Sequence, residues 1–405
     1  MVNCSQSKWT ILLYFNGNNE LEPEMWNAKA LAASVDAGVN IRVVLQLGRE
    51  DRRLARLMRP SDGIPLEAAR WLGVRRYQLA RGKPVLVQQL DKVNMADPRQ
   101  LCDFLSWGMQ AYPADHYMLV LSGHGYQYVG IMTDYSQEKP YILGIPEMAA
   151  SLRLVGQRLS KEIDILVLDS CYCNCIEVLY EIGGEGCCTR AVITHAGQAP
   201  LGGMPYSQLI RVMRENVYGN GPMDACRQIV EAISRRPGCL PFGLRHRSPA
   251  LKQLFSDLAA MYLDSGQGSG PPLSRLVNTP HRDDPWYAVA AELRECLSSL
   301  IICCKATDEL SAPITVAVSL LDDPDKVRLY HRLAFGQSNL WFEMLQGKAG
   351  TTYTPPAPSA HHELLPLALD RRVVRSNLAS MNPALNESQI DSLLDELLRH
   401  KGWDI

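Results

Sequence analysis

Three short polar segments of this chain carry side chains suited to nucleophilic and acid–base chemistry, and each follows an apolar run. The segments are Ser122-Gly123-His124-Gly125, Asp169-Ser170-Cys171 and the stretch that begins at His195. A cysteine thiol attacks a carbonyl carbon effectively when a nearby histidine supplies the proton that the leaving group needs. The residue types therefore predict a thiol nucleophile at Cys171, with His124 as its proton donor and His195 as a rival for that role.

The residues around Cys171 favour this chemistry. The stretch 173–182 has the pattern of a helix that ends at Gly183-Gly184, and a thiol just before a helix start is favoured as thiolate by the helix dipole. Gly125 has no side chain to obstruct a carbonyl oxygen, so its backbone N–H and that of Cys171 are candidates for an oxyanion hole. The alternative interpretation is that His124 is a turn residue and Cys171 a small buried one.

The elements that must position these segments are short apolar strands separated by helices. The predicted strands span 10–14, 41–45, 117–121, 163–168 and 191–194. The predicted helices between them include 97–110 and 146–157. This alternation predicts a mostly parallel sheet covered by helices on both faces. Because the carboxyl ends of parallel strands meet at one edge of a sheet, we expect Cys171, His124 and His195 to lie at the same edge.

The pattern changes after about residue 220, where helices replace most of the strands. Helices are predicted over 223–234, 248–263 and 287–301, a strand over 314–318, and an amphipathic helix from about Asn386. We therefore divide the chain into a catalytic core over 1–220, a mainly helical part of the same unit over 221–346, and a proline-containing linker and tail over 347–405. Most tail helices of this kind pack on their own domain, and binding to a partner or to the active site is the alternative.

The composition is that of an ordinary globular protein of 405 residues, with 46% hydrophobic and 21% charged residues. A net charge of −2 gives no general attraction for phosphate backbones, so nucleic acid is not an expected partner. The N-terminus lacks the apolar core of a signal peptide, and no apolar run is long enough to cross a membrane. We therefore expect a cytoplasmic protein that keeps its 12 cysteines as reduced thiols.

The histidine and cysteine segments belong to an ordered series that runs from about Trp9 to about Leu345. The other members are Trp9–Tyr14 with Asn18–Glu22, Trp71–Tyr77, Val93–Pro98, Ile176–Glu181, Gly203–Tyr206, and Tyr330–Phe335 with Trp341. Each motif is short, but the ordered series is specific, and it resembles the clostripain family (peptidase C11, clan CD) of cysteine peptidases. The resemblance implies an α/β fold, a caspase-like sandwich with a mostly parallel central sheet flanked by helices, plus a mainly helical C-terminal region.

The resemblance also implies a role for each site residue. It implies Cys171 as the nucleophile, His124 as the general acid for the leaving amine, and the amides of Gly125 and Cys171 at the oxyanion. It places Asp169 at the mouth of an S1 pocket that prefers Arg or Lys, because a carboxylate pairs strongly with a guanidinium or ammonium in a partly dry pocket. His195, which we interpret as part of the wall of this pocket, begins a segment where many relatives carry acidic residues, so basic specificity rests mainly on Asp169.

Other patterns in the same sequence have competing interpretations. Cys171, Cys173 and Cys175 could be read as a metal site together with Cys187-Cys188 and His195. Side chains two apart on a helix point to nearly opposite sides, however, so the three thiols would not converge on one ion. We therefore expect no metal, and we interpret Cys173 and Cys175 as helix positions packed against the sheet. The triplet Asp224-Ala225-Cys226 repeats the letters of the motif without a preceding strand, and we interpret it as a helix start with Asp224 as N-cap.

These features predict a cysteine endopeptidase that cleaves proteins or peptides after Arg or Lys through a Cys171/His124 dyad and a thioester, with no cofactor. Such an enzyme would suit a regulated intracellular cascade in stress, cell death or antiviral (anti-phage) defence, with an upstream activating protease or a regulatory partner. The alternative is a catalytically idle, caspase-like binding module in a larger assembly.

Self-cleavage is expected to be limited. Lys139 is the basic residue between the histidine and cysteine strands, but Pro140 follows it and removes the N–H at the leaving side of the bond. Arg371, Arg372 and Arg375, between the linker and the tail helix, are better sites if that segment is mobile. The alternative is that this segment is packed and is never cut.

Overall fold

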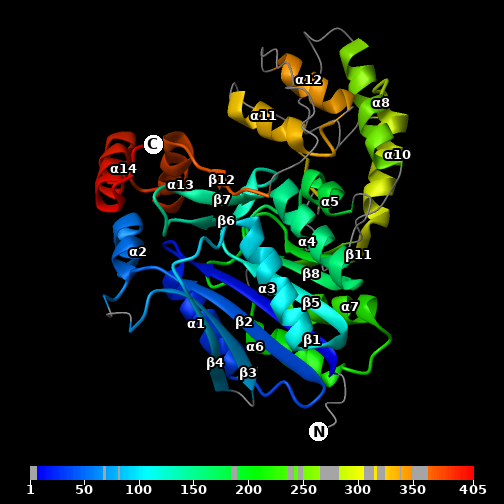
Figure 1. Cartoon of the computed structure of the whole chain (residues 1–405). Helices are drawn as coiled ribbons and strands as arrows, with labels where there is room; N and C mark the ends of the chain where they lie inside the picture. Colours follow the sequence, from blue (N-terminus) through cyan, green and yellow to red (C-terminus); the bar gives the residue numbers. More distant parts are fainter. Residues whose placement is uncertain are drawn as a thin grey trace.

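A large sheet forms the centre of the described part of the chain (Figure 1). The computed structural model describes residues 7–66, 70–80, 83–183, 189–235, 241–244, 250–264, 282–304, 314–316, 324–337, 339–348 and 364–405. Within these ranges nine strands form the sheet, in the order β11-β10-β9-β8-β5-β1-β2-β3-β4. In chain order they are β1 (Ser7–Gly17), β2 (Ile41–Arg49), β3 (Gly73–Ala80), β4 (Lys83–Asp91), β5 (Ala114–Ser122), β8 (Ile163–Asp169), β9 (Thr189–His195), β10 (Pro241–Leu244) and β11 (Ile301–Cys304).

The middle of this sheet is parallel. β2, β1, β5, β8 and β9 run in one direction, whereas β3, β4, β10 and β11 pair antiparallel at the two edges. Leu12 and Tyr14 of β1 belong to the apolar layer on one face, and Ile11 and Leu13 belong to the layer on the other. Strands that are buried on both faces have continuous apolar sequences. The central strands could therefore be predicted from apolar runs in the sequence. The predicted α/β fold class is confirmed.

Helices cover both faces of the sheet. One layer contains α3 (Pro98–Ala111), α4 (Ile145–Leu159), α5 (Ile176–Ile182), α8 (Leu251–Asp264), α10 (Tyr287–Ser299), α11 (Pro324–Arg332) and α12 (Leu340–Lys348). The opposite layer contains α1 (Glu22–Ala33), α6 (Tyr206–Glu215) and α7 (Pro222–Ile233). α1, α3 and α7 contact strands of the sheet, whereas α8 packs against α10 and α12, and α11 packs against α12, away from the sheet (Figure 1).

Three elements in the structure have boundaries that differ from those predicted from the sequence. The helix predicted over 287–301 ends at Ser299, and residues 301–304 form β11 instead. Strands β10 and β11, which lie in the range 221–346, therefore extend the sheet of the core predicted over 1–220. Helix α7 is capped by Gly221, and Asp224 lies in its first turn rather than at the N-cap. A strand was predicted over 314–318. In the described residues 314–316, Thr315 forms an isolated β-bridge with Cys175.

The C-terminal tail packs on the edge of the core near the segment that follows His124. A smaller sheet has the order β12-β7-β6 and is formed by β6 (Gly130–Asp134), β7 (Tyr141–Gly144) and β12 (Leu367–Ala368). α13 (Arg371–Met381) and α14 (Glu387–Lys401), drawn in red in Figure 1, lie beside this sheet and α2 (Arg52–Met58). Asn386 caps α14 through a capping box with Gln389. The predicted amphipathic helix therefore exists and docks on its own protein.

Some predicted features lie outside the described residues. These are Cys187-Cys188, the Gly/Ser-rich run 265–272 and the proline-containing linker 351–358. Among the helices in the described ranges, none is both long enough and apolar enough to cross a membrane.

Candidate active site

The register of β5 and β8 brings the histidine and cysteine segments together. Ser122 of β5 pairs with Asp169 of β8, and the N–H of Gly123 donates a hydrogen bond to the carbonyl of Asp169 over 3.3 Å. His124 and Cys171 each lie two residues beyond this pair. Both therefore leave the sheet at the same edge, where the sequence predicted them to meet.

Gly125 allows the two segments to touch. A Cβ atom placed on Gly125 would lie 2.9 Å from Cβ of Ser170 and 3.0 Å from the backbone N of Cys171, and closer still to the carbonyl oxygen of Cys171. Because any side chain would collide here, only glycine lets the backbone after His124 lie against that of Cys171. The two backbones proposed for the oxyanion hole are thus in contact.

The surroundings of the Cys171 thiol favour its protonated form. Its Sγ is partly exposed and accepts a hydrogen bond from the N–H of Ala199 at 3.3 Å. Burial raises the pKa of the Cys171 thiol, and the Ala199 N–H only partly offsets this effect. The expected helix start at residue 173 is wrong, because α5 begins at Ile176 and Tyr172 adopts a φ of 57° in a turn. The helix dipole therefore does not act directly on the thiol.

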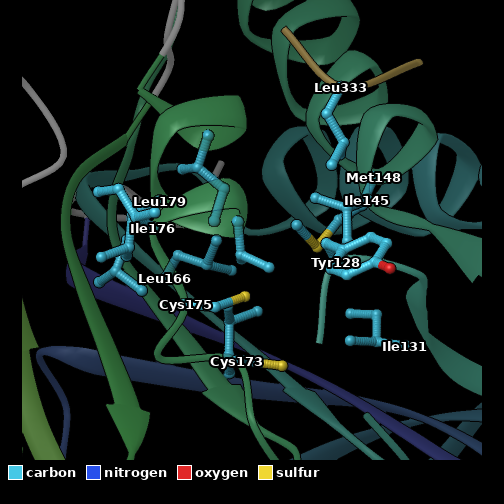
Figure 2. Packing of buried hydrophobic residues seen from close by; sticks show 14 of the residues in the cluster. Tyr128, Ile131, Ile145, Met148, Leu166, Cys173, Cys175, Ile176, Leu179 and Leu333 are labelled. Carbon is cyan, nitrogen blue, oxygen red and sulfur yellow. The ribbon is translucent and has the colours of Figure 1, made fainter. Parts of the chain in front are cut away.

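Cys173 and Cys175 belong to the core. Both are buried in the turn before α5, and Figure 2 shows them among apolar side chains that include Leu166, Ile176 and Leu179. Burial raises the pKa of both thiols. Their packing agrees with the prediction, although they precede the helix instead of lying in it. No group of three or more His, Cys, Asp or Glu side chains in the described ranges is arranged to hold a metal ion.

A buried carboxylate holds His124. The Nε2 atom of His124 is hydrogen-bonded to Oε1 of Glu20, which is fully buried just beyond the end of β1. Burial alone raises the pKa of Glu20, but the charge of His124 and the hydrogen bond to it outweigh burial and lower the pKa overall. An ionised Glu20 fixes the orientation and tautomer of the imidazole.

Sequence reasoning did not identify Glu20 as a site residue. β1 lies next to β5, and Phe15 pairs with Ser122, so the residues after β1 reach the same edge as His124. The available signal was a carboxylate six residues after the strand predicted over 10–14, whereas His124 lies three residues after the strand predicted over 117–121. It becomes usable only when the order of the strands in the sheet is known.

Asp169 and His195 form a buried pair beside the nucleophile. Oδ1 of Asp169 lies 2.8 Å from Nε2 of His195. Its Oδ2 accepts hydrogen bonds from Oγ of Ser122 at 3.0 Å, from the N–H of Met204 at 3.0 Å and from the hydroxyl of Tyr206. Burial raises the pKa of Asp169, but the hydrogen bond and charge of His195, together with the other donors, lower it overall.

The two residues predicted to line an S1 pocket are both buried. Asp169 is 3% exposed and His195 is 1% exposed, and both oxygens of Asp169 accept hydrogen bonds within the protein. Asp169 therefore lies beneath the surface, and its place at the mouth of an S1 pocket, which the family resemblance implies, stays a prediction. Its burial also separates His195 from any leaving group, and this leaves His124 as the histidine that a substrate is able to reach.

Solved structures of similar fold are cysteine proteases. The fold matches a secreted C11 cysteine protease from Bacteroides thetaiotaomicron, solved with an irreversible peptide inhibitor, at 13% identity and a TM-score of 0.56, covering 82% of this chain and 98% of that one. It also matches an inactive zymogen C11 protease from Parabacteroides distasonis at 15% identity and a TM-score of 0.55, with the same coverage. At these identities the likeness is one of fold.

Comparison of the sequence matches one protein family over part of the chain. No curated protein matches it, but the model of the clostripain family matches residues 78–243. This range contains His124, Cys171, Asp169 and His195, which are the residues that the sheet register brings to one edge. Residues 78–243 of the chain therefore match the clostripain family, peptidase C11, and the described structure has the fold of solved C11 cysteine proteases.

Proposed function

We propose that this chain is a cysteine endopeptidase that cleaves proteins or peptides through Cys171 and His124. The observation that carries the proposal is the pairing of Ser122 with Asp169, which sets the histidine and cysteine segments side by side. The match of residues 78–243 to the clostripain family supports cysteine peptidase activity in general. The assignment of these particular residues rests on their geometry.

The proposed reaction uses His124 as both base and acid. Cys171 gives its proton to His124 as Sγ attacks the carbonyl carbon, and the oxyanion accepts hydrogen bonds from the N–H groups of Gly125 and Cys171. The C–N bond then breaks as His124 protonates the leaving amine, and a thioester remains on Cys171. His124 next takes a proton from water, which attacks the thioester, and the sulfur leaves and regains a proton. Glu20 stabilises the imidazolium that forms in each half of the reaction.

Cleavage after Arg or Lys belongs to this proposal. Asp169 has a lowered pKa, so it is ionised two residues from the nucleophile and gives the site a negative potential. His195 is hydrogen-bonded to the same carboxylate. A peptide panel with Arg, Lys, Gln and Leu before the scissile bond tests the preference, and we expect turnover of the two basic peptides to exceed that of Gln. Equal turnover of Arg and Gln peptides would show that Asp169 does not select the substrate.

Turnover of these peptides also separates an enzyme from an idle binding module. We expect wild-type protein under reducing conditions, across a range of calcium, to release the fluorophore, and Cys171→Ala and His124→Ala to lose activity by similar factors because the two groups act as one unit. Cys296→Ala, which changes a partly exposed cysteine on α10, is the matched control. If wild type and Cys171→Ala turn over the peptides equally, the chain is not a peptidase, and the binding-module interpretation is favoured.

The cellular role that we propose is regulated proteolysis in the cytoplasm, with an upstream protease or a partner as activator. One relative of similar fold is described as secreted and another as an inactive zymogen, so both location and activation need measurement. Cell fractionation gives the location. A pull-down with Cys171→Ala as a trap gives the substrates, and a cascade role fails if wild-type enzyme cleaves none of the proteins recovered.

A further inference from the structure

Two cysteines that the proposed reaction does not use meet over one glycine of the sheet. Cys226 lies on α7, and Cys303 lies in β11, where it pairs with Gly243 of β10. A Cβ atom added to Gly243 would lie 2.7 Å from the sulfur of Cys226 and 2.7 Å from the sulfur of Cys303. The two thiols thus occupy the space that a side chain at Gly243 would fill, and each changes the pKa of the other.

The two thiols differ in access and in acidity. Cys226 is buried, whereas Cys303 is partly exposed. The neighbouring Cys226 thiol lowers the pKa of the Cys303 thiol, whereas Cys303 together with burial raises the pKa of Cys226. Peroxides react with thiolates that solvent is able to reach. Cys303 is therefore the thiol that would be oxidised first, and Cys226 is the neighbour in position to resolve it.

We propose that Cys226 and Cys303 form a reversible disulfide when the protein meets hydrogen peroxide. The Cys303 thiolate attacks one peroxide oxygen, the O–O bond breaks, and the leaving hydroxide takes a proton to become water. Cys226 then attacks the sulfenic acid on Cys303, the S–S bond forms, and the hydroxyl group leaves with the proton of Cys226 as a second water. Two electrons pass from the thiols to one peroxide, and a dithiol reductant reverses the reaction.

The alternative is a pair of inert packed thiols, since most buried cysteines act as small apolar residues. That alternative explains the burial of Cys226 but gives no reason for two sulfur atoms that each lie 2.7 Å from the Cβ position of one glycine. The disulfide would join α7 to the edge strand β11. Strand β10 lies between β11 and β9, and β9 ends at His195. Closing the chain between residues 226 and 303 restricts the unfolded state, so the oxidised protein should melt at a higher temperature.

The test uses the full chain carrying Cys171→Ala, which removes the proposed nucleophile from peroxide chemistry. After treatment with hydrogen peroxide and alkylation of the remaining thiols, we expect a non-reducing digest to contain a peptide pair joined through Cys226 and Cys303. Dithiothreitol should separate the pair and return the melting temperature to that of the reduced protein. Cys296→Ser changes another partly exposed cysteine, and both results should survive in it.

Two further variants in the same background identify the order of events. In Cys226→Ala the sulfenic acid has no resolving thiol, so we expect dimedone to label Cys303. In Cys303→Ala we expect neither the joined peptides nor labelling of Cys226. Recovery of Cys226 and Cys303 as separately alkylated peptides, after peroxide has oxidised other cysteines of the folded chain, would overturn the proposal. A link from either residue to a different cysteine would overturn it as well.

Discussion

At the scale of single residues, Glu20 is the group that orients His124, and its substitution is the sharpest test of the proposed acid–base chemistry. Glu20→Gln keeps the size of the side chain and removes its charge. General acid–base catalysis contributes about 10²–10⁴-fold, so we expect kcat to fall by roughly 10- to 100-fold with KM little changed. Steady-state kinetics of the variant measures this. A kcat within twofold of wild type would remove Glu20 from the mechanism.

Gly125 is the second residue whose substitution has a clear expected result. A methyl group on Gly125 would collide with Ser170 and Cys171, so Gly125→Ala should separate the two segments and remove most activity, at a cost of about 1–3 kcal/mol in stability. Gly202→Ala is the matched control, because a Cβ on Gly202 meets no atom within 4 Å. Kinetics and thermal melts of both variants provide the measurement. Full activity in Gly125→Ala would contradict the proposed oxyanion site.

The buried carboxylate of Asp169 predicts a pH dependence of stability. Its pKa is lowered from the ordinary value of 3.8, so its ionised form stabilises the folded state above that pH, and the contribution is lost as the pH falls through the lowered pKa. We expect Asp169→Asn to be less stable than wild type at pH 7 and the difference to shrink at pH 3. Denaturant titrations at the two pH values measure it. A difference independent of pH would contradict an ionised, paired Asp169.

At the scale of elements, strand ends were predictable and turns were not. The strands before His124, Cys171 and His195 could be predicted because buried parallel strands have a continuous apolar pattern. The turn after Cys171 depends on a long-range contact, in which the N–H of Tyr172 donates to the carbonyl of Gly197, and no local pattern encodes it. The partner of His124 was hidden for the same reason, since Glu20 reaches it only through the order of the strands.

Helix α13 contains the three arginines that are candidates for self-cleavage, and its packing is expected to protect them. All three lie in this helix, where Arg371 pairs with Asp395 and Arg375 pairs with Asp391, each at 2.6 Å. Exposed ion pairs stabilise little, but Val374 and Leu378 bury the other face of the helix. A protease needs an extended chain, so we expect wild type and Cys171→Ala to show the same intact mass. A shorter wild-type chain that ends at one of these arginines would contradict this.

At the scale of the whole molecule, the tail holds the loop between the histidine and cysteine segments. The amide of Asn377 donates to the hydroxyl of Tyr135 at 3.2 Å, and the indole N–H of Trp403 donates to the carbonyl of Gln137 at 3.1 Å. The N–H of Leu369 donates to the carbonyl of Pro140 at 2.9 Å. The exposed Lys139 thus lies in a loop that the tail restrains on both sides, and this restraint adds to the effect of Pro140 against cleavage there.

Trp403 is the residue through which this restraint is best tested. It is buried near the end of the chain, and its ring meets that of Tyr135 edge-on at 5.4 Å. Replacing a buried tryptophan by alanine costs about 3–5 kcal/mol, so Trp403→Ala should lower the melting temperature. It should also lower kcat, because Tyr135 follows directly on β6, and the N–H of Met132 in β6 donates to the carbonyl of His124.

The matched control for Trp403→Ala is Tyr218→Ala, which removes an aromatic ring that is 73% exposed and should change neither quantity. Thermal melts give the stability, and peptide turnover well below the melting temperature gives kcat. If Trp403→Ala melts like wild type, the tail is not packed on the core as described. If it melts earlier but keeps full kcat, the tail stabilises the fold without positioning His124. A fall in both would mean that residues more than two hundred positions after His124 in the sequence help to hold the proposed proton donor in place.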